Sequence, residues 1–261
     1  MLLGGAEAPY TSLAAIYDTL TADYDYEQWV SCVLQLYRSL RGSPTDHMYV
    51  LDAGCGTGRA MAVLLDRGCR VVGVDASTEM LALAAARLAE RRPLLISQDV
   101  RQLDLGQQRF DLVMSLCDSL NYLLSLPDLT TAIRRMASHL LPGGVLVFDM
   151  NTAHKLATVY GDHSYIEEGP GFFLAWENTW QPSVKMVEMR LSLFTCVEHA
   201  KRCLWERTDE THRERAYNPC EVVEALRNVG FGKIIGPLAA FTLEDARDDS
   251  ERVFYAAQLG S

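Results

Sequence analysis

The stretch VLDAGCGTG at residues 50–58 constrains the fold of this chain more than any other feature. An apolar run ends at Asp52, and Gly54, Gly56 and Gly58 follow within six residues. A short apolar run without alternation is typical of a strand buried on both faces of a parallel sheet. Because glycine adopts backbone conformations closed to other residues, the three glycines predict a tight turn from this strand into a helix.

The next hundred residues repeat this alternation of apolar runs with helical patterns. The expected strands are 49–52, 71–75, 94–97, 112–116 and 145–149, and the expected helices are about 27–41, 58–67, 77–90 and 128–140, with Ser77 and Asp128 as N-caps. This order predicts an α/β fold with a doubly wound, mostly parallel sheet.

The pattern changes after Asn151. Residues about 164–215 alternate apolar and polar side chains, which predicts antiparallel strands inserted into the fold. Asn218 and Pro219 then begin a helix that ends at Gly230, and strands near 233–235 and 252–258 complete the sheet.

Composition narrows the possible partners and compartment. A formal charge of −10 argues against a nucleic-acid partner, because phosphate contacts need clustered cations. The start MLLGGAEAP has no basic region, and no apolar run could cross a bilayer, so we expect a cytoplasmic protein with no membrane partner. Seven scattered cysteines without a CxxC pair predict reduced thiols, those of Cys196 and Cys203 included. The oligomeric state stays open, a homo-oligomer included.

Asp52 decides between two kinds of nucleotide ligand. A dinucleotide fingerprint needs a further glycine where Arg59 stands, and a carboxylate at residue 52 would repel a pyrophosphate by roughly a few kcal/mol. S-adenosylmethionine carries a sulfonium and an ammonium and no phosphate, so an acid suits it. Asp75 is expected to accept hydrogen bonds from the ribose hydroxyls, and Asp99 from the adenine amino group.

Five segments in order, DAGCGTG, GVDAS, QDV, FDLVMSLCDSLNYL and LLPGGVLVFDMN, resemble the motifs of class I S-adenosylmethionine-dependent methyltransferases. The resemblance covers about residues 15–151. It implies a Rossmann-like sheet of seven strands and S-adenosylmethionine as cofactor. It further implies that the cofactor is bound by Asp52, Gly54, Cys55, Gly56, Gly58, Asp75, Ala76, Met80, Asp99, Val100 and Leu116.

The two ends of the chain resemble small-molecule enzymes of that family, including glycine-type and antibiotic-tailoring aminosugar N-methyltransferases. This implies an N-terminal helical lid over residues 1–42, a cofactor-binding domain of 43–152 and 216–261, and a substrate-binding insertion of 153–215. Residues expected to contact the substrate are Tyr24, Trp29, Trp176, Glu206 and Tyr217.

We expect the catalytic residues to be Tyr17, which would cover the sulfonium, and Asp118, Asn121 and Tyr122, which follow the fourth strand. Acids near this position favour a cationic amine, so the leading hypothesis is metal-free N-methylation of a small amine such as an aminosugar, an amino acid or an antibiotic-type intermediate.

Three alternatives remain. A small-molecule O-methyltransferase could hold Mg²⁺ on Asp118, Asp149 and Asn151. A non-catalytic cofactor-binding module needs no substrate insertion, and a nicotinamide dehydrogenase conflicts with Asp52 and Arg59. His212 is expected to be a surface histidine on a strand and not a base.

Overall fold

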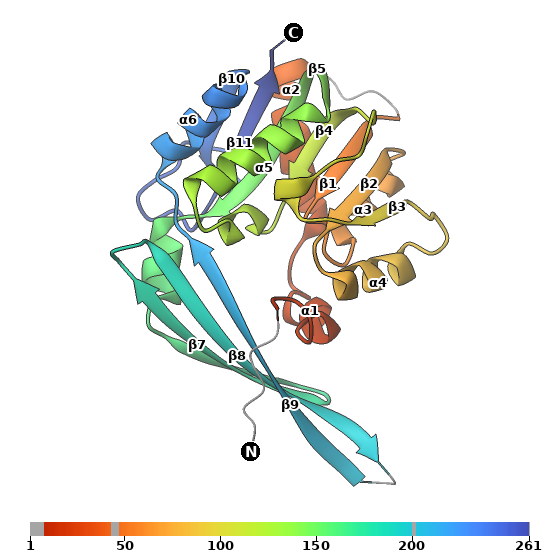
Figure 1. Ribbon diagram of the computed structural model, residues 1–261, viewed down its shortest axis with the longest axis vertical. Coiled ribbons are helices and arrows are strands. Elements are labelled where there is room, and N and C mark those ends of the chain that lie inside the picture. Colours follow the sequence, from red (N-terminus) through yellow and green to blue (C-terminus); the bar gives the residue numbers. More distant parts are fainter. Residues whose placement is uncertain (1–7, 43–46, 200–201, 261) are drawn as a thin grey trace.

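The computed structural model describes residues 8–42, 47–199 and 202–260. Seven strands form one mixed sheet in the order β10-β11-β5-β4-β1-β2-β3 (Figure 1). The strands are β1 (Tyr49–Ala53), β2 (Arg70–Asp75), β3 (Leu94–Ser97), β4 (Phe110–Ser115), β5 (Leu140–Asn151), β10 (Phe231–Ala239) and β11 (Arg252–Leu259).

The pairing within this sheet determines where a ligand can bind. Strands β1 to β5 pair in parallel, whereas β11 runs antiparallel between β5 and β10. The chain moves from β1 outward to β3 and then returns to the other side of β1 to form β4. The crevice at the carboxyl ends of β1 and β4 is therefore the topological switch point of the sheet, where α/β proteins bind ligands.

Helices cover both faces of the sheet through two apolar clusters. Buried residues of α2, α3 and α4 pack on one face, and those of α5 and α6 pack on the other. The helices are α2 (Tyr26–Arg41), α3 (Arg59–Asp66), α4 (Thr78–Arg87), α5 (Leu126–Ser138) and α6 (Pro219–Val229), with short 3₁₀ helices η1 (Val100–Gln102) and η2 (Ser119–Tyr122).

The helix starts follow the capping rules, with one correction. Ser77 accepts from the backbone N–H of Met80 as predicted, but the cap of α5 is Ser125 and not Asp128. The Ser125 side chain accepts from the Asp128 backbone N–H, so the helix begins a turn earlier than expected.

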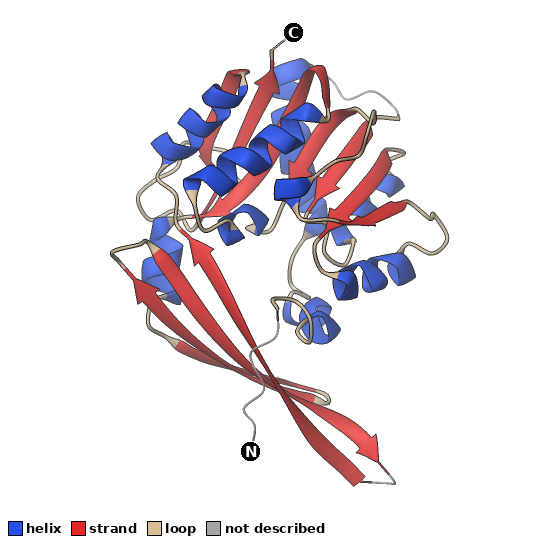
Figure 2. Cartoon of the chain, in the orientation of Figure 1, coloured by secondary structure: helices blue, strands red, loops and turns tan. Residues whose placement is uncertain are grey.

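A second sheet of four antiparallel strands extends away from the first, and Figure 2 shows it as a long twisted ribbon. Apolar side chains of β7 and β8 pack against Leu13 and against Ile16 of α1 (Ala14–Leu20), so the N-terminal segment lies on this sheet. The strands are β6 (Ser164–Gly169), β7 (Phe172–Gln181), β8 (Met186–His199) and β9 (Arg202–Arg215), preceded by a π-helix η3 (Lys155–Tyr160).

Two further findings concern the cysteines and the helices of the described residues. Cys196 is disulfide-bonded, so the expectation of reduced thiols was wrong for this residue. Among the described helices, none combines the length and apolar character needed to span a bilayer.

The cap of α6 gives a test of the fold that is separate from the cofactor site. Asn218 accepts from the backbone N–H of Cys220, and Glu221 accepts from the backbone N–H of Asn218, which together make a capping box. We expect Asn218→Ala to lower the free energy of unfolding by about 1 kcal/mol in urea denaturation. Glu224→Ala, on the exposed side of the same helix, should change it by less than about 0.5 kcal/mol. Equal losses in the two variants would contradict the cap.

Candidate active site

A cavity of about 440 Å³ lies at the carboxyl ends of β1 and β4, within the range of small-molecule sites. Residues from five segments line it: the N-terminal segment, the loop after β1, the ends of β2 and β3, and the loop after β4. The predicted residues along its walls are Tyr17, Asp52, Gly54, Cys55, Gly56, Asp75, Ala76, Met80, Asp99, Val100, Leu116 and Tyr122.

The glycine-rich turn makes room for this cavity. Gly54, Gly56 and Gly58 all have positive φ, at 88°, 51° and 76°. A Cβ on Gly54 would lie 2.7 Å from the hydroxyl of Ser119, and one on Gly58 would lie 3.1 Å from the side chain of Leu88. Gly54 is therefore needed where the loops after β1 and β4 meet, whereas Gly58 does not line the cavity and serves as N-cap of α3.

Asp75 ends β2 and is oriented by the backbone. Its two carboxylate oxygens accept from the N–H of Gly56 at 2.8 Å and from the N–H of Ser77 at 2.9 Å. Each oxygen keeps a lone pair, so the carboxylate can accept two further hydrogen bonds. This geometry fits a ribose with two free hydroxyls.

Asp99 has a partner that the sequence did not suggest. Arg101 donates to it from its backbone N–H at 2.8 Å and from its guanidinium, and these bonds lower the pKa of Asp99. The carboxylate is therefore ionised and lines the cavity, but Arg101 occupies part of its hydrogen-bonding capacity.

Asp52 provides the clearest sign that the cavity is built for a cation. The residue is 1% exposed, and its Oδ2 has no hydrogen-bond partner. Burial, with Asp75 nearby, raises the pKa of Asp52 to about 8. A buried carboxylate oxygen without a partner, in a residue that lines a cavity, is costly unless a ligand supplies a donor or a positive charge. The ammonium and sulfonium of S-adenosylmethionine meet this requirement.

The N-terminal segment is attached to the glycine-rich turn by polar contacts. Asp18 of α1 accepts from the hydroxyl of Thr57 at 2.7 Å and forms an ion pair with Arg87. Arg59 donates to the backbone carbonyls of Thr21 and Tyr24. These contacts hold Tyr17 over the cavity, and the residue that breaks the dinucleotide fingerprint, Arg59, is one of the anchors.

A buried ion-pair network lies beside the cavity at the ends of β4 and β5. Arg252 of β11 forms ion pairs with Asp118 at 2.7 Å and with Asp149. Asp149 also accepts from the backbone N–H of Cys117 and Asp118, and it is fully buried. Asp118, which the sequence placed beside the acceptor, thus already has a cationic partner and lines neither cavity.

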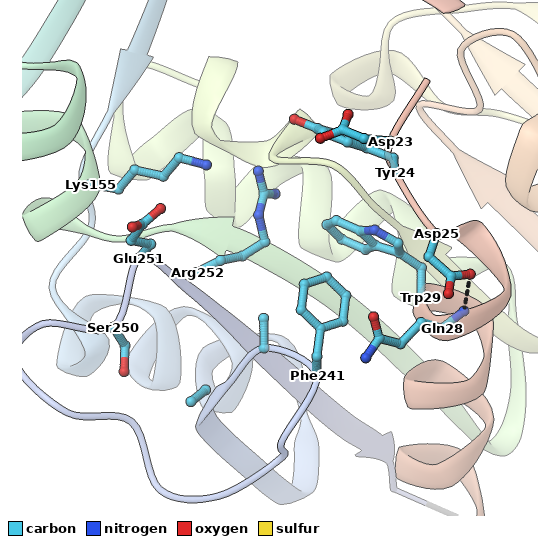
Figure 3. A pocket seen from close by; sticks show the side chains of 12 residues that line it. Asp23, Tyr24, Asp25, Gln28, Trp29, Lys155, Phe241, Ser250, Glu251 and Arg252 are labelled. Atoms are coloured by element: carbon cyan, nitrogen blue, oxygen red, sulfur yellow. Dashed lines mark hydrogen bonds between the residues drawn. The ribbon is translucent and has the colours of Figure 1, made fainter. Parts of the chain in front are cut away.

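A second cavity of about 440 Å³ lies on the other side of this network (Figure 3). Arg252 projects into it beside Trp29, with its guanidinium 5.0 Å from the centroid of the ring, and Phe241 packs edge-on to Trp29. The predicted substrate residues Tyr24 and Trp29 line this cavity and not the first. Its other lining residues are Asp23, Asp25, Gln28, Lys155, Ala239, Ala240, Ser250 and Glu251.

Four predicted site residues lie elsewhere. Asn121 is fully buried and ties η2 to the backbone of Asn151 and Arg215. The Tyr217 hydroxyl donates to the backbone carbonyls of Leu123 and Ser125 within the main core. Trp176 and Glu206 line neither cavity: Trp176 packs against the apolar cluster of the second sheet, and Glu206 is exposed on β9.

His212 is the main correction to the sequence interpretation. It is 2% exposed, not on the surface, and it lies between Glu210 and the hydroxyl of Tyr122. Glu210, His212 and Glu214 recur every second residue on β9, which puts them on one face of the strand. This spacing in the sequence could have indicated that the three side chains share a face. It could not indicate that the N-terminal segment covers that face, where Tyr10, Ser12 and Leu13 donate their backbone N–H to Glu210.

Comparisons with known proteins agree with this geometry. A doubly wound sheet with an acid-lined cavity at its switch point defines an α/β nucleotide-binding protein, and residues 50–144 match the model of the methyltransferase domain family. The chain is 31% identical to the putative methyltransferase YqeM of Bacillus subtilis (strain 168), over 95% of this chain and 96% of that protein. It therefore belongs to the S-adenosylmethionine-dependent methyltransferases, and its cofactor is S-adenosylmethionine.

Two further comparisons bear on the fold and on the acceptor. The crystal structure of an S-adenosylmethionine-dependent methyltransferase from Clostridium acetobutylicum ATCC 824 superimposes with a TM-score of 0.82 at 29% identity, over 97% of this chain and 99% of that one. A dTDP-4-amino-2,3,4,6-tetradeoxy-D-glucose N,N-dimethyltransferase of Saccharopolyspora spinosa is 32% identical over 52% of this chain and 53% of that protein.

The burial of Asp52 predicts that Asp52→Asn makes the cofactor-free protein more stable at high pH but weakens its binding of S-adenosylmethionine. Because the pKa of Asp52 rises from 3.8 to about 8 on folding, the folded protein retains a proton that the unfolded chain has released, and stability falls as pH rises through this interval. Asparagine cannot ionise, so the stability of Asp52→Asn relative to the parent should increase from about pH 4 to about pH 8.

Urea denaturation of the cofactor-free proteins across that pH range would measure the difference. Calorimetry at pH 8 should show weaker S-adenosylmethionine binding by the same variant, since the compensating negative charge is gone. A stability difference that is constant with pH would mean that the Asp52 carboxylate has a partner in the folded protein.

Proposed function

We propose that this protein transfers a methyl group from S-adenosylmethionine to the nitrogen of a small amine without a metal ion. The observation that carries the proposal is the placement of acids. Asp52 and Asp75 line the first cavity. Asp23, Asp25 and Glu251 outnumber Lys155 among the charged residues of the second, where Arg252 is already paired with Asp118 and Asp149. An acidic entrance favours a cationic acceptor in the encounter.

Different residues of the first cavity fit different parts of the cofactor. Asp75 fits the ribose hydroxyls, Asp52 fits a positive charge, and Tyr17 closes the cavity from the N-terminal side. When bound, the cofactor supplies an electrophilic methyl group on a sulfonium. The contribution of the protein is to hold the acceptor close and aligned and to exclude water, which can account for most of the acceleration of such a displacement.

The second cavity is the proposed site for the body of the acceptor, whose nitrogen must reach the cofactor methyl in the first cavity for direct transfer. Cys117 lines the first cavity, and its neighbour Asp118 pairs with Arg252, which lines the second, so the two cavities adjoin at the loop after β4. Tyr24 and Trp29 give this cavity an aromatic side, and Phe241 lies against Trp29. An aromatic wall with an acidic rim suits an amine carried on an apolar or sugar-like body.

The geometry disfavours the metal-assisted O-methyltransferase. Two of its three expected ligands already bind a cation: Asp118 and Asp149 both form ion pairs with Arg252, and both oxygens of Asp149 also accept from backbone N–H groups. Within the described ranges, no group of three or more His, Cys, Asp or Glu side chains is arranged to hold a metal ion. The relative from Saccharopolyspora spinosa, which is named as an N,N-dimethyltransferase, also supports transfer to nitrogen.

A transfer assay with methyl-labelled cofactor tests the proposal. The full chain would be incubated with a panel of small amines, aminosugars and phenols, each with EDTA and with added Mg²⁺. We expect label in amines only, undiminished by EDTA, and a rate that rises with pH as the free amine forms. Label in phenols that depends on Mg²⁺ would support the oxygen-methylating alternative instead.

Phe241 provides a test of the acceptor site. This residue is 38% exposed and lines only the second cavity, so its removal should leave the fold and the first cavity intact. We expect Phe241→Ala to raise KM for the acceptor several-fold, corresponding to about 1 kcal/mol of lost aromatic contact, with the cofactor Kd unchanged. Leu83→Ala, at a similarly exposed apolar residue on α4, is the matched control and should change neither constant. An unchanged KM in Phe241→Ala would exclude this cavity as the acceptor site.

A further inference from the structure

We infer that Glu210, His212, Tyr122 and Tyr10 form a relay that accepts a proton from the acceptor at the edge of the cofactor cavity. The inference rests on the proposed transfer to nitrogen, because an amine that arrives as an ammonium must lose a proton before it can attack. Unlike Asp118, Glu210 forms no ion pair with Arg252 or with another arginine or lysine of the described residues, and its partner is His212.

Three hydrogen bonds connect the four side chains. The hydroxyls of Tyr10 and Tyr122 are 2.7 Å apart, the Tyr122 hydroxyl is 2.9 Å from Nδ1 of His212, and Nε2 of His212 is 2.8 Å from Oε2 of Glu210. The residues come from the N-terminal segment, η2 and β9, which are far apart in the sequence. Tyr10 and Tyr122 line the cofactor cavity, whereas His212 and Glu210 lie behind them.

The direction of each bond follows from the charge of Glu210. Burial acts to raise its pKa, but hydrogen bonds from His212 and from the backbone N–H of Leu13 and Tyr10, together with the positive charge of a protonated His212, outweigh burial and hold the pKa below its ordinary value. An ionised carboxylate only accepts, so Nε2–H of His212 donates to it, and whenever the ring is neutral its Nδ1 accepts from Tyr122. Tyr122 in turn accepts from Tyr10, which leaves the oxygen of Tyr10 free to accept from a ligand.

Among the described residues, Glu210 is the one carboxylate hydrogen-bonded to His212. On β8, its register partner is Met189, and the partners of Glu210 and Glu214 are Leu191 and Val187. Burial, with Asp118 nearby, raises the pKa of Glu214 to about 8, so that side chain is mainly protonated at neutral pH. Asp118 is paired with Arg252, and the rings of Tyr10 and Tyr122 pack edge-on to the imidazole.

The proton transfer balances without another reactant. The N–H bond of the acceptor ammonium breaks, its electron pair stays on nitrogen as the attacking lone pair, and the proton moves to the Tyr10 oxygen. Tyr10 passes its own proton to Tyr122, which passes its proton to Nδ1 of His212. Both phenols end neutral, as they must, since burial holds the pKa of each well above its ordinary value. The resulting imidazolium is paired with the Glu210 carboxylate and returns the proton to solvent after turnover.

A first test needs no acceptor. The chain has six histidines, and NMR of the ¹⁵N-histidine-labelled protein, assigned with His212→Gln, reports the tautomer of residue 212. We expect the neutral ring to carry its proton on Nε2, and a shift of its Nδ1 signal in Tyr122→Phe, which removes only the hydroxyl. A ring protonated on Nδ1 alone would overturn the relay, whatever the outcome of the transfer assay.

The second test uses the amine that the transfer assay identifies. We expect His212→Gln and Tyr122→Phe to lower kcat by roughly 10²-fold near pH 7, with recovery as pH rises and the amine loses its proton to solvent. The cofactor Kd, measured by calorimetry, should stay within twofold of the parent value.

His139→Gln is the matched control. His139 is also buried, but its Nε2 accepts from the backbone N–H of Leu105, away from both cavities, so the parent pH profile should persist. Glu210 also accepts from three backbone N–H groups of the N-terminal segment, so the cluster could have a purely structural role. In that case His212→Gln and Tyr122→Phe would lower kcat equally at every pH. That uniform loss would overturn the relay. If the transfer assay labels no amine, the proposed function is wrong. The NMR result would still decide the directions of the hydrogen bonds.

Discussion

The carboxylate of Asp52, buried at the end of β1 with an unpartnered oxygen, is the constraint on which the rest of the site depends. A desolvated acid of this kind weakens the empty protein, because folding removes its hydration without supplying a partner. The surrounding structure tolerates it because glycines leave space beside it and a sheet of seven strands fixes the end of β1. The buried acid therefore lowers the free energy of unfolding of the empty protein, and it gives the cavity a charge that complements S-adenosylmethionine.

The second sheet and the N-terminal segment act together around this cavity. Glu210 on β9 binds the backbone of residues 10–13, and Leu13 and Ile16 pack on β7 and β8. The same strand carries His212, whose bond to Tyr122 reaches the loop after β4. A single face of β9 therefore holds the N-terminal segment over the cofactor cavity and supplies the proposed proton relay.

Local patterns were sufficient to predict most of the core. Apolar runs and glycine positions located β1 to β5, and Asn218 with Pro219 and Gly230 located α6, because these signals act within a few residues. Long-range pairing was not predictable from them. Asp118 looked free because its partner, Arg252, is 134 residues away, and His212 looked exposed because the segment covering it lies at the other end of the chain.

A crystal structure of the protein with S-adenosylhomocysteine, the demethylated product, tests the central claim most directly. The account predicts the ribose hydroxyls on the two oxygens of Asp75 and the product ammonium within hydrogen-bonding distance of Oδ2 of Asp52, with Tyr10 and Tyr17 closing the cavity. Product bound in the second cavity, or an Asp52 carboxylate still unpartnered in the complex, would contradict it.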